Sequence, residues 1–214
     1  MKISHHSDTH GLPRQAVHDE ADVIVLSGDL CPNRTRGHVD IEIAYQENWL
    51  ARTGEQWRVW AKGKPLVLIP GNHDFFIDIA RMLRRAGVAA HDVYLASATI
   101  YGVTFLGLPD IPWMGGDWNH ERGEQEIEAR FATVLDERPD VVVNHCPPHG
   151  VLDEPYDFGD YHIGSTAFAR LLGSHGHEPK AYLCGHCHER GGRVERVRST
   201  IVSNAATRRA LIEI

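Results

Sequence analysis

The chain has 214 residues, of which 42% are hydrophobic and 24% are charged, and its formal net charge is −7. This length suits one well-packed domain covering residues 1–214. The acidity argues against a nucleic-acid partner, because proteins that bind polyanions usually present basic surfaces. No apolar run reaches the length of a membrane span and the N-terminus has no apolar signal segment, so we expect a cytoplasmic protein without a membrane partner.

Short apolar runs alternate with longer amphipathic stretches along most of the chain. Near-continuous β-branched runs suit strands that are buried on both faces. Strands are expected at residues 3–6, 22–26, 65–69, 103–107, 140–143 and 181–184, and helices at about 38–62, 75–85, 121–136 and 165–172. Near the C-terminus, antiparallel strands are expected at 193–197, 200–202 and 210–214. The alternation predicts an α/β protein.

Asp, Asn and His residues directly follow five of these strands. The five segments are Ser7-Asp8-Thr9-His10-Gly11, Ser27-Gly28-Asp29-Leu30, Pro70-Gly71-Asn72-His73-Asp74, Asn144-His145-Cys146-Pro147-Pro148 and Gly185-His186-Cys187-His188. In open α/β sheets, the loops at the carboxyl ends of the strands converge on one crevice. We therefore expect these side chains to lie close together.

Several carboxylates and imidazoles in one place require a cation to compensate them. Oxygen and nitrogen donors without an emphasis on thiolates suit Mn²⁺, Fe²⁺ or Fe³⁺, Zn²⁺ or Co²⁺. Four glycines within these segments allow sharp turns and a close approach of the backbone, namely Gly11, Gly28, Gly71 and Gly185. The pattern predicts a metal site.

The five motifs, written D-x-H, G-D, G-N-H-D, N-H and G-H-x-H, resemble the calcineurin-like metallophosphoesterase superfamily in composition and order. The resemblance covers the chain almost from end to end. It implies a four-layer α/β fold, in which a β-sandwich of two mixed sheets is flanked by helices. It also implies that a pair of divalent metal ions binds at one end of the two sheets.

The same resemblance assigns roles to individual residues. One ion would bind Asp8, His10, Asp29 and His188, and the second would bind Asp29, Asn72, His145 and His186, with Asp29 bridging both. The hydroxide between two such ions is the nucleophile. His73 would face the leaving-group oxygen as a general acid or hydrogen-bond donor, and Asp74 would orient its ring.

Each of these residues also has an ordinary structural explanation when it is considered alone. Asp8 and Asp29 could cap a helix or a turn, and Asn72 could occupy a left-handed turn. His186 and His188 could simply mark an exposed strand end. The occurrence of all the motifs together and in order favours the metal site.

Two features argue against a serine/threonine protein phosphatase. Those enzymes favour an Arg soon after the second-motif Asp and a Glu after the Asn-His pair, whereas this chain has Leu30-Cys31-Pro32-Asn33 and then Asp74. The chain is also too short to include the DNA-binding cap of the repair-type nucleases. Small stand-alone members are the better match, among them the class III cyclic-nucleotide phosphodiesterases and the compact metallophosphoesterase-domain proteins.

Segments 110–123 and 153–164 are expected to border the site and to set specificity. Trp113 and Trp118 are candidates to stack on a nucleobase or an aryl group, and a packed Ω-loop is an equal alternative. His149 is a candidate substrate contact, and a solvent-exposed turn histidine is the alternative. The Cys184-x-x-Cys187 pair lacks the partners of a zinc site, so free thiols are expected, and Cys31, Cys146 and Cys187 are expected as small residues at the rim of the site.

These observations predict a binuclear metal-dependent phosphodiesterase that hydrolyses a small-molecule phosphodiester, a nucleotide being one such substrate. One alternative is a phosphomonoesterase acting on a small molecule or a protein. The other is a metal-binding scaffold without catalytic activity. The sequence leaves the native metal pair and the oligomeric state open.

Overall fold

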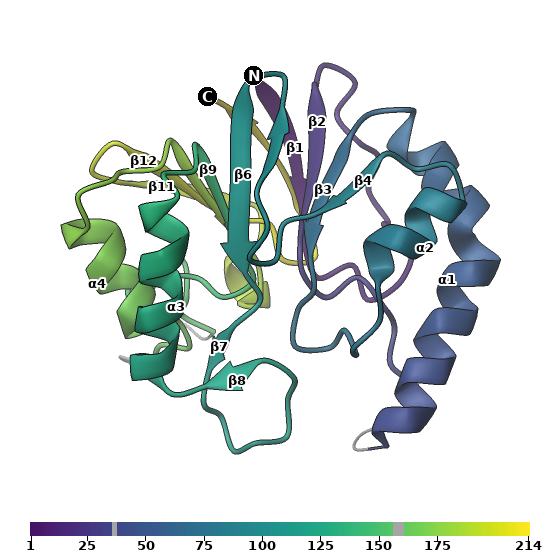
Figure 1. Ribbon diagram of the computed structural model, residues 1–214, viewed down its shortest axis with the longest axis horizontal. Coiled ribbons are helices and arrows are strands. Elements are labelled where there is room, and N and C mark those ends of the chain that lie inside the picture. The colour runs from purple at the N-terminus through teal and green to yellow at the C-terminus, as the bar shows by residue number, and fades with distance from the viewer. Residues whose placement is uncertain (36–37, 156–160) are drawn as a thin grey trace.

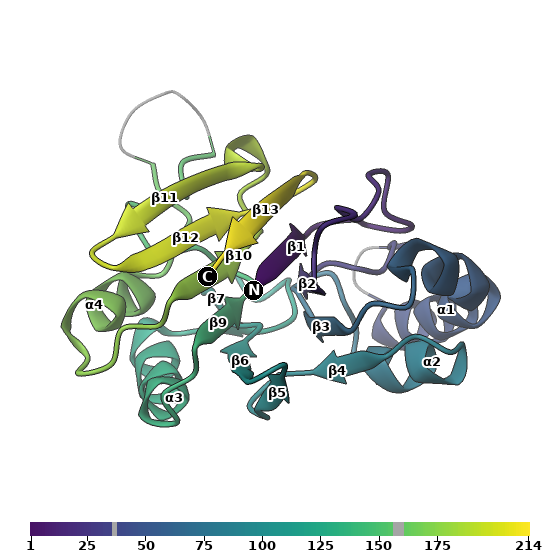
Figure 2. The same ribbon diagram turned by 90° about the horizontal axis from the view of Figure 1, so that it is seen from above.

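Two β-sheets pack face to face, and two pairs of helices cover their outer faces (Figures 1 and 2). The computed structural model describes residues 1–35, 38–155 and 161–214. The arrangement has four layers in the order α/β/β/α, which confirms the fold expected from the resemblance. Of the expected loop at 153–164, residues 156–160 lie outside the described part.

The first sheet has the strand order β13-β1-β2-β3-β4. Its strands are β1 (Lys2–His6), β2 (Val23–Ser27), β3 (Leu66–Ile69), β4 (Ala90–Asp92) and β13 (Arg209–Glu213). The first four are parallel to one another, and β13 pairs antiparallel with β1. Helices α1 (Val39–Ala61) and α2 (Ile79–Arg85) cover the outer face of this sheet (Figure 2).

The second sheet has the order β11-β12-β10-β9-β6-β5. Its strands are β5 (Ala98–Ile100), β6 (Val103–Leu108), β9 (Val141–Asn144), β10 (Ala181–Cys184), β11 (Arg193–Val197) and β12 (Thr200–Asn204). The four central strands are parallel, and β5 and β11 are antiparallel edges. Helices α3 (Glu124–Asp136) and α4 (Thr166–Ser174) cover its outer face.

The apolar runs are continuous because each central strand is buried on both faces. In β2, Val23 and Val25 pack between the sheets, whereas Ile24 and Leu26 pack under α1 and α2. In β9, Val143 packs between the sheets in the same way. Successive side chains of a strand point to opposite faces, so one run of apolar residues supplies two cores.

The structure differs from the sequence expectations mainly in short elements. Strands β4 and β5 were not expected, nor was the short pair of β7 (Ile111–Pro112) and β8 (Glu121–Arg122), because segments of two or three residues carry no long apolar run. Helix α2 begins at Ile79 because the Asp78 side chain accepts a hydrogen bond from the Arg81 amide. Near the C-terminus, β11 and β12 are antiparallel as expected, but β12 runs parallel to β10.

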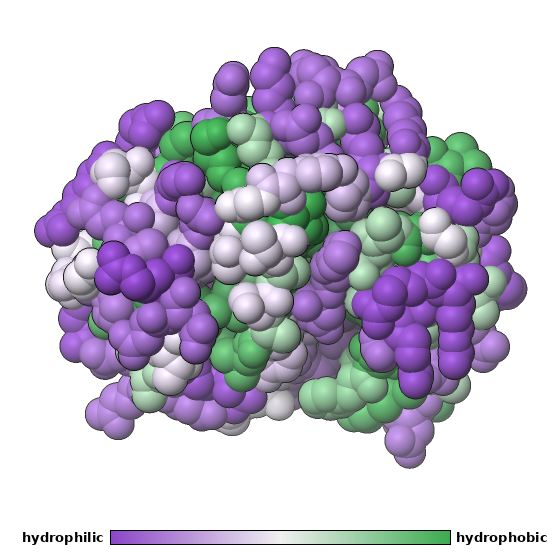
Figure 3. All heavy atoms as spheres, turned by 45° about the horizontal axis from the view of Figure 1, so that its top comes forward, coloured by the Kyte–Doolittle hydropathy of each residue, from purple (hydrophilic) through white to green (hydrophobic). Residues whose placement is uncertain are grey.

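No helix in the described part of the chain combines the length and the apolarity needed to cross a bilayer. Hydrophilic and hydrophobic residues are interspersed over the face of the molecule drawn in Figure 3.

Strand β1 carries two buried histidines directly before the first polar motif. The ring nitrogens of His5 lie 2.9 Å from the Ser203 hydroxyl and 2.9 Å from the Ser27 hydroxyl, so this ring links the two sheets. Nε2 of His6 lies 2.9 Å from the Ser4 hydroxyl. Burial lowers the pKa of both rings to about 3, because the charged imidazolium cannot be hydrated there.

We expect the free energy of unfolding to fall with pH below about 6.5, because the unfolded chain then binds protons that buried His5 and His6 do not bind. The loss should reach about 2 kcal/mol per ring at pH 5. Urea unfolding of chelator-treated protein at pH 7.5, 6 and 5 measures it. His5→Gln should flatten the pH dependence, whereas His91→Gln, at a partly exposed site, should not. An unchanged slope in His5→Gln would contradict the assignment.

Candidate metal centre

Loops at the carboxyl ends of five strands bring the expected ligands together. The strands β1, β2 and β3 belong to the first sheet, and β9 and β10 belong to the second, so the site lies where one end of each sheet meets the other. The side chains that gather there are those of Asp8, His10, Asp29, Asn72, His145, His186 and His188. Neither sheet alone carries the complete set.

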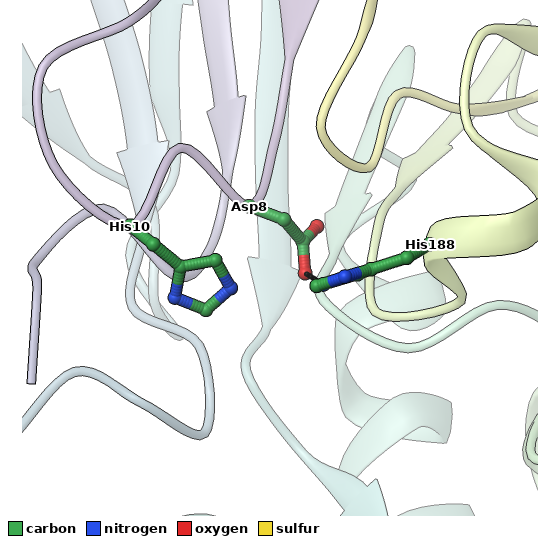
Figure 4. Close-up of side chains that lie close together, drawn as sticks. All are labelled: Asp8, His10 and His188. Atoms are coloured by element: carbon green, nitrogen blue, oxygen red, sulfur yellow. Dashed lines mark hydrogen bonds and ion pairs between the residues drawn. The ribbon is translucent and has the colours of Figure 1, made fainter.

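Asp8 lies between two imidazoles (Figure 4). Nε2 of His188 is 3.1 Å from Oδ1 of Asp8, and the rings of His10 and His188 have centroids 5.5 Å apart. One ligand atom from each of these three residues lies within 4.8 Å of the other two. That spacing allows the three side chains to bind a single ion.

A second group forms around Asp29. Oδ2 of Asp29 lies 3.5 Å from Nε2 of His145 and 3.8 Å from Nε2 of His10, so this carboxylate faces both groups of imidazoles. Oδ1 of Asn72 lies 2.9 Å from Nε2 of His145 and 3.1 Å from Nδ1 of His186. Asp29 is therefore placed where it could serve two ions at once.

The backbone at the site is strained. Asp8, His10, Asp29 and His186 have φ values of 51°, 43°, 54° and 65°, which place them in the left-handed region. Residues other than glycine adopt this region rarely, and such strain gathers at functional sites, where surrounding structure maintains it. The fold holds these four side chains in place at a cost in conformational energy.

Two glycines allow the loops to approach one another. Gly28 has a φ of +103°, and a Cβ atom there would lie 2.3 Å from Nδ1 of His145. A Cβ atom on Gly185 would lie 2.0 Å from the Ser7 hydroxyl and 2.1 Å from a carboxylate oxygen of Asp8. A side chain at either position would displace an expected ligand.

The buried carboxylates of the site require positive charge nearby. Burial alone would raise the pKa of Asp29, but the charge of His145 lowers it well below its usual value. Burial disfavours the charged form of His145, yet the neighbouring Asp29 carboxylate raises its pKa to about 9. In the metal-free chain a proton on His145 thus supplies part of the compensation that a buried carboxylate requires.

His186 differs from His145. Burial and the charge of His145 lower its pKa to about 4, so the ring is neutral. Its Nε2 atom is buried and has no hydrogen-bond partner in the described part of the chain. A buried nitrogen without a partner is costly, and a neutral imidazole is the form that binds metals. The donor set and this atom fit a centre for divalent cations that prefer oxygen and nitrogen ligands.

His73 lies beside the centre, but the prediction that Asp74 orients its ring is wrong. Nδ1 of His73 donates to Oδ1 of Asn33 at 2.7 Å, and Nδ2 of Asn33 donates to the His73 carbonyl at 3.0 Å. Asp74 instead accepts from the backbone amides of Gly71, Leu30 and Cys31, because its buried carboxylate closes the turn. The only sequence signal for Asn33 was its place four residues after Asp29.

Two clefts, of about 400 and 730 Å³, open from the centre, and both are lined by Asn72, His73 and Trp118. The rings of Trp118 and His73 have centroids 4.5 Å apart. Trp113 is 65% exposed, and neither it nor His149 lines either cleft. The ring of His149 instead lies 4.6 Å from that of His162.

The loop that carries Trp118 is held by its own side chains. The Glu121 carboxylate accepts hydrogen bonds from the amides of Met114, Gly116 and Trp118. Nδ2 of Asn119 donates to the carbonyls of Asn72 and Asp74, which ties the loop to the turn of the third motif. The loop is therefore a packed loop, as in the Ω-loop alternative. It also holds the Trp118 ring against the ring of His73 at the centre.

The four cysteines are free thiols, as expected, but the expectation that three of them border the site as rim residues is wrong. Cys31, Cys146, Cys184 and Cys187 are all buried. Burial raises the pKa of Cys31 and Cys146 well above the usual value. These thiols are structural.

Gly185→Ala should lower both the stability and the metal affinity, because the added Cβ atom overlaps Ser7 and Asp8. We expect a loss of about 1–3 kcal/mol in the free energy of unfolding, as for other overpacked sites. Thermal unfolding and Mn²⁺ titration calorimetry measure the two effects. The matched control is Gly173→Ala in α4, where a Cβ atom meets nothing within 4 Å. Equal metal affinity in both variants would contradict the close packing at Gly185.

Comparison with known proteins agrees with this geometry. A solved crystal structure superposes with a TM-score of 0.68 at 17% sequence identity, covering 96% of this chain and 90% of the other chain, which shows a shared fold. No curated protein matches the sequence. The family model described as calcineurin-like phosphoesterase matches residues 1–190, which include all five motifs. The chain therefore belongs to the calcineurin-like phosphoesterase family.

Proposed function

We propose that this phosphoesterase is a binuclear enzyme that hydrolyses a small-molecule phosphodiester. One cation would bind Asp8, His10, Asp29 and His188, and the other would bind Asp29, Asn72, His145 and His186. The observation that carries the proposal is the convergence of these side chains from both sheets around buried carboxylates. The imidazole and carboxylate donors suit Mn²⁺, Fe²⁺ or Fe³⁺, Zn²⁺ or Co²⁺. When bound, such ions supply an activated water and neutralise charge on the phosphate.

The two clefts favour a diester over a monoester. A phosphodiester carries two ester groups, and two clefts extend from Asn72, His73 and Trp118. Among the described residues, neither cleft is lined by Lys or Arg. Among the residues that the structure describes, the second negative charge of a monoester would therefore find no basic side chain there. The same feature supports a small molecule rather than a nucleic acid as the substrate.

His73 is the chain's own candidate for proton transfer. The Asn33 amide oxygen can only accept a hydrogen bond, so it keeps a proton on Nδ1 and leaves Nε2 to carry the second proton, which the imidazolium form of the ring can donate. The His73 amide also donates to Oδ1 of Asp29 at 2.7 Å, which couples the ring's position to the shared carboxylate. We assign the protonated His73 ring the role of donor, through Nε2, to the leaving-group oxygen, and Asn33 the role of positioning residue, while Asp74 closes the turn.

A cytoplasmic location also belongs to this proposal. Four unpaired thiols in one chain suit a reducing compartment.

With Mn²⁺, we expect kcat/KM for bis(p-nitrophenyl) phosphate to exceed that for p-nitrophenyl phosphate by about tenfold, because both clefts accept an ester group. Release of p-nitrophenol measures both reactions. Asp29→Asn should lower metal content and activity together, whereas Asp117→Asn, at the rim of the larger cleft, should retain the metals. A preference for the monoester would favour a phosphomonoesterase. Metal binding without hydrolysis of either ester would favour the scaffold.

His73→Ala should retain the metals and lower kcat, most strongly for esters whose leaving groups have a high pKa. A loss of about 10²–10⁴-fold is typical when a general acid is removed. A series of substituted phenyl esters, with metal content measured in parallel, tests this. If His73→Ala lost its metals, the residue would be a ligand and the assignment would be wrong.

A further inference from the structure

The walls of the smaller cleft carry an unusual distribution of charge. Among the residues that the structure describes, it is lined by no Lys or Arg, and Glu189 lies on its wall. The Glu189 carboxylate is exposed and makes no hydrogen bond or ion pair within the described part of the chain. Arg14 and Arg208 line a different cavity, of about 170 Å³, beside Asp8. A carboxylate without a hydrogen bond or ion pair among the described residues therefore faces the space next to the metal ligands.

Aromatic rings line the same cleft. Tyr161 is 58% exposed there, and Trp118 lies between this cleft and the larger one, held by Glu121 and Asn119. The face of an aromatic ring attracts a cation, above all a quaternary ammonium, and a nearby carboxylate adds to the attraction. A neutral apolar group would also pack on these rings, but the Glu189 carboxylate would not attract it electrostatically.

The larger cleft repeats the pattern on the other side of Trp118. Asp117 lines it, and its carboxylate has no hydrogen bond or ion pair within the described residues. A substrate that extends from the reacting phosphate on either side therefore meets an aromatic ring and a negative charge. Either carboxylate would disfavour a second phosphate or carboxylate on the substrate.

We propose that the cleft selects phosphodiesters by the charge of the ester group that is retained on phosphorus, favouring an ammonium and disfavouring a second anion, and that Glu189 sets this selectivity. The inference rests on the proposed phosphodiesterase activity and specifies its substrate class. It concerns the alcohol portion of the substrate, which does not react.

Three p-nitrophenyl phosphodiesters isolate the charge. Their retained alcohols are choline, its neutral carbon isostere 3,3-dimethylbutanol, and an anionic alcohol of similar length, 4-hydroxybutanoate. In each reaction water forms a new bond to phosphorus, the bond from phosphorus to the p-nitrophenyl oxygen breaks, and p-nitrophenol leaves. The bond that breaks is the same throughout, so differences in kcat/KM report recognition of the retained group.

We expect the choline ester to exceed the neutral isostere by about three- to tenfold in kcat/KM, and the anionic ester to fall below it by a similar factor. Raising the ionic strength should reduce both ratios, because exposed charges are screened. Glu189→Gln should bring the ratios toward one, and Glu189→Lys should invert them. The control is Glu195→Gln, at an exposed site on β11 that lines neither cleft.

Ratios of kcat/KM between two esters also distinguish a change in charge selectivity from a change in the metal content of the centre. Glu189 follows His188, so its variants could bind less metal, but both substrates in a ratio share the same metal content and folded fraction. Equal rates for the three esters in the wild-type protein, or wild-type ratios in Glu189→Gln, would overturn the charge selectivity alone. Failure to hydrolyse any of the three with metal bound would overturn the proposed phosphodiesterase function instead.

Discussion

The structure depends on the burial of two carboxylates that contact imidazole rings and accept hydrogen bonds from backbone amides. Asp8 and Asp29 are each 2% exposed, and isolated charges with so little hydration would be strongly destabilising. Without metal, His188 and His145 approach these carboxylates, and the pKa of His145 rises to about 9. A pair of cations would satisfy the same demand more fully, and would also use the buried Nε2 of His186.

The scaffold provides this environment by joining two sheets at one end. Motifs on β1, β2 and β3 meet motifs on β9 and β10, and the core between the sheets holds the two groups of loops in register. The left-handed backbone at Asp8, Asp29 and His186 is sustained by that packing, since isolated loops would relax to commoner conformations. The stability of the sheets is thus used to maintain strained ligand positions.

The surroundings of the centre decide what it can act on. The turn of the third motif contacts the loop of Trp118 through Asn119, so the metal ligands and the cleft are built as one unit. The absence of basic side chains from both clefts, within the described residues, leaves recognition of the phosphate to the centre itself. This division of roles is the basis for our proposal of a substrate with a single reacting phosphate between two ester groups.

The sequence by itself determined the strands with long apolar runs, the order of the motifs and the gathering of the polar residues, because buried parallel strands have continuous apolar runs and place their following loops at one sheet edge. Only the tertiary structure decided which side chains meet across the sheets. Asn33, rather than Asp74, contacts the His73 ring, Trp118 rather than Trp113 lines the clefts, and the cysteines are buried. Such contacts depend on how loops from distant segments pack together, and a local pattern of residue types carries no record of that geometry.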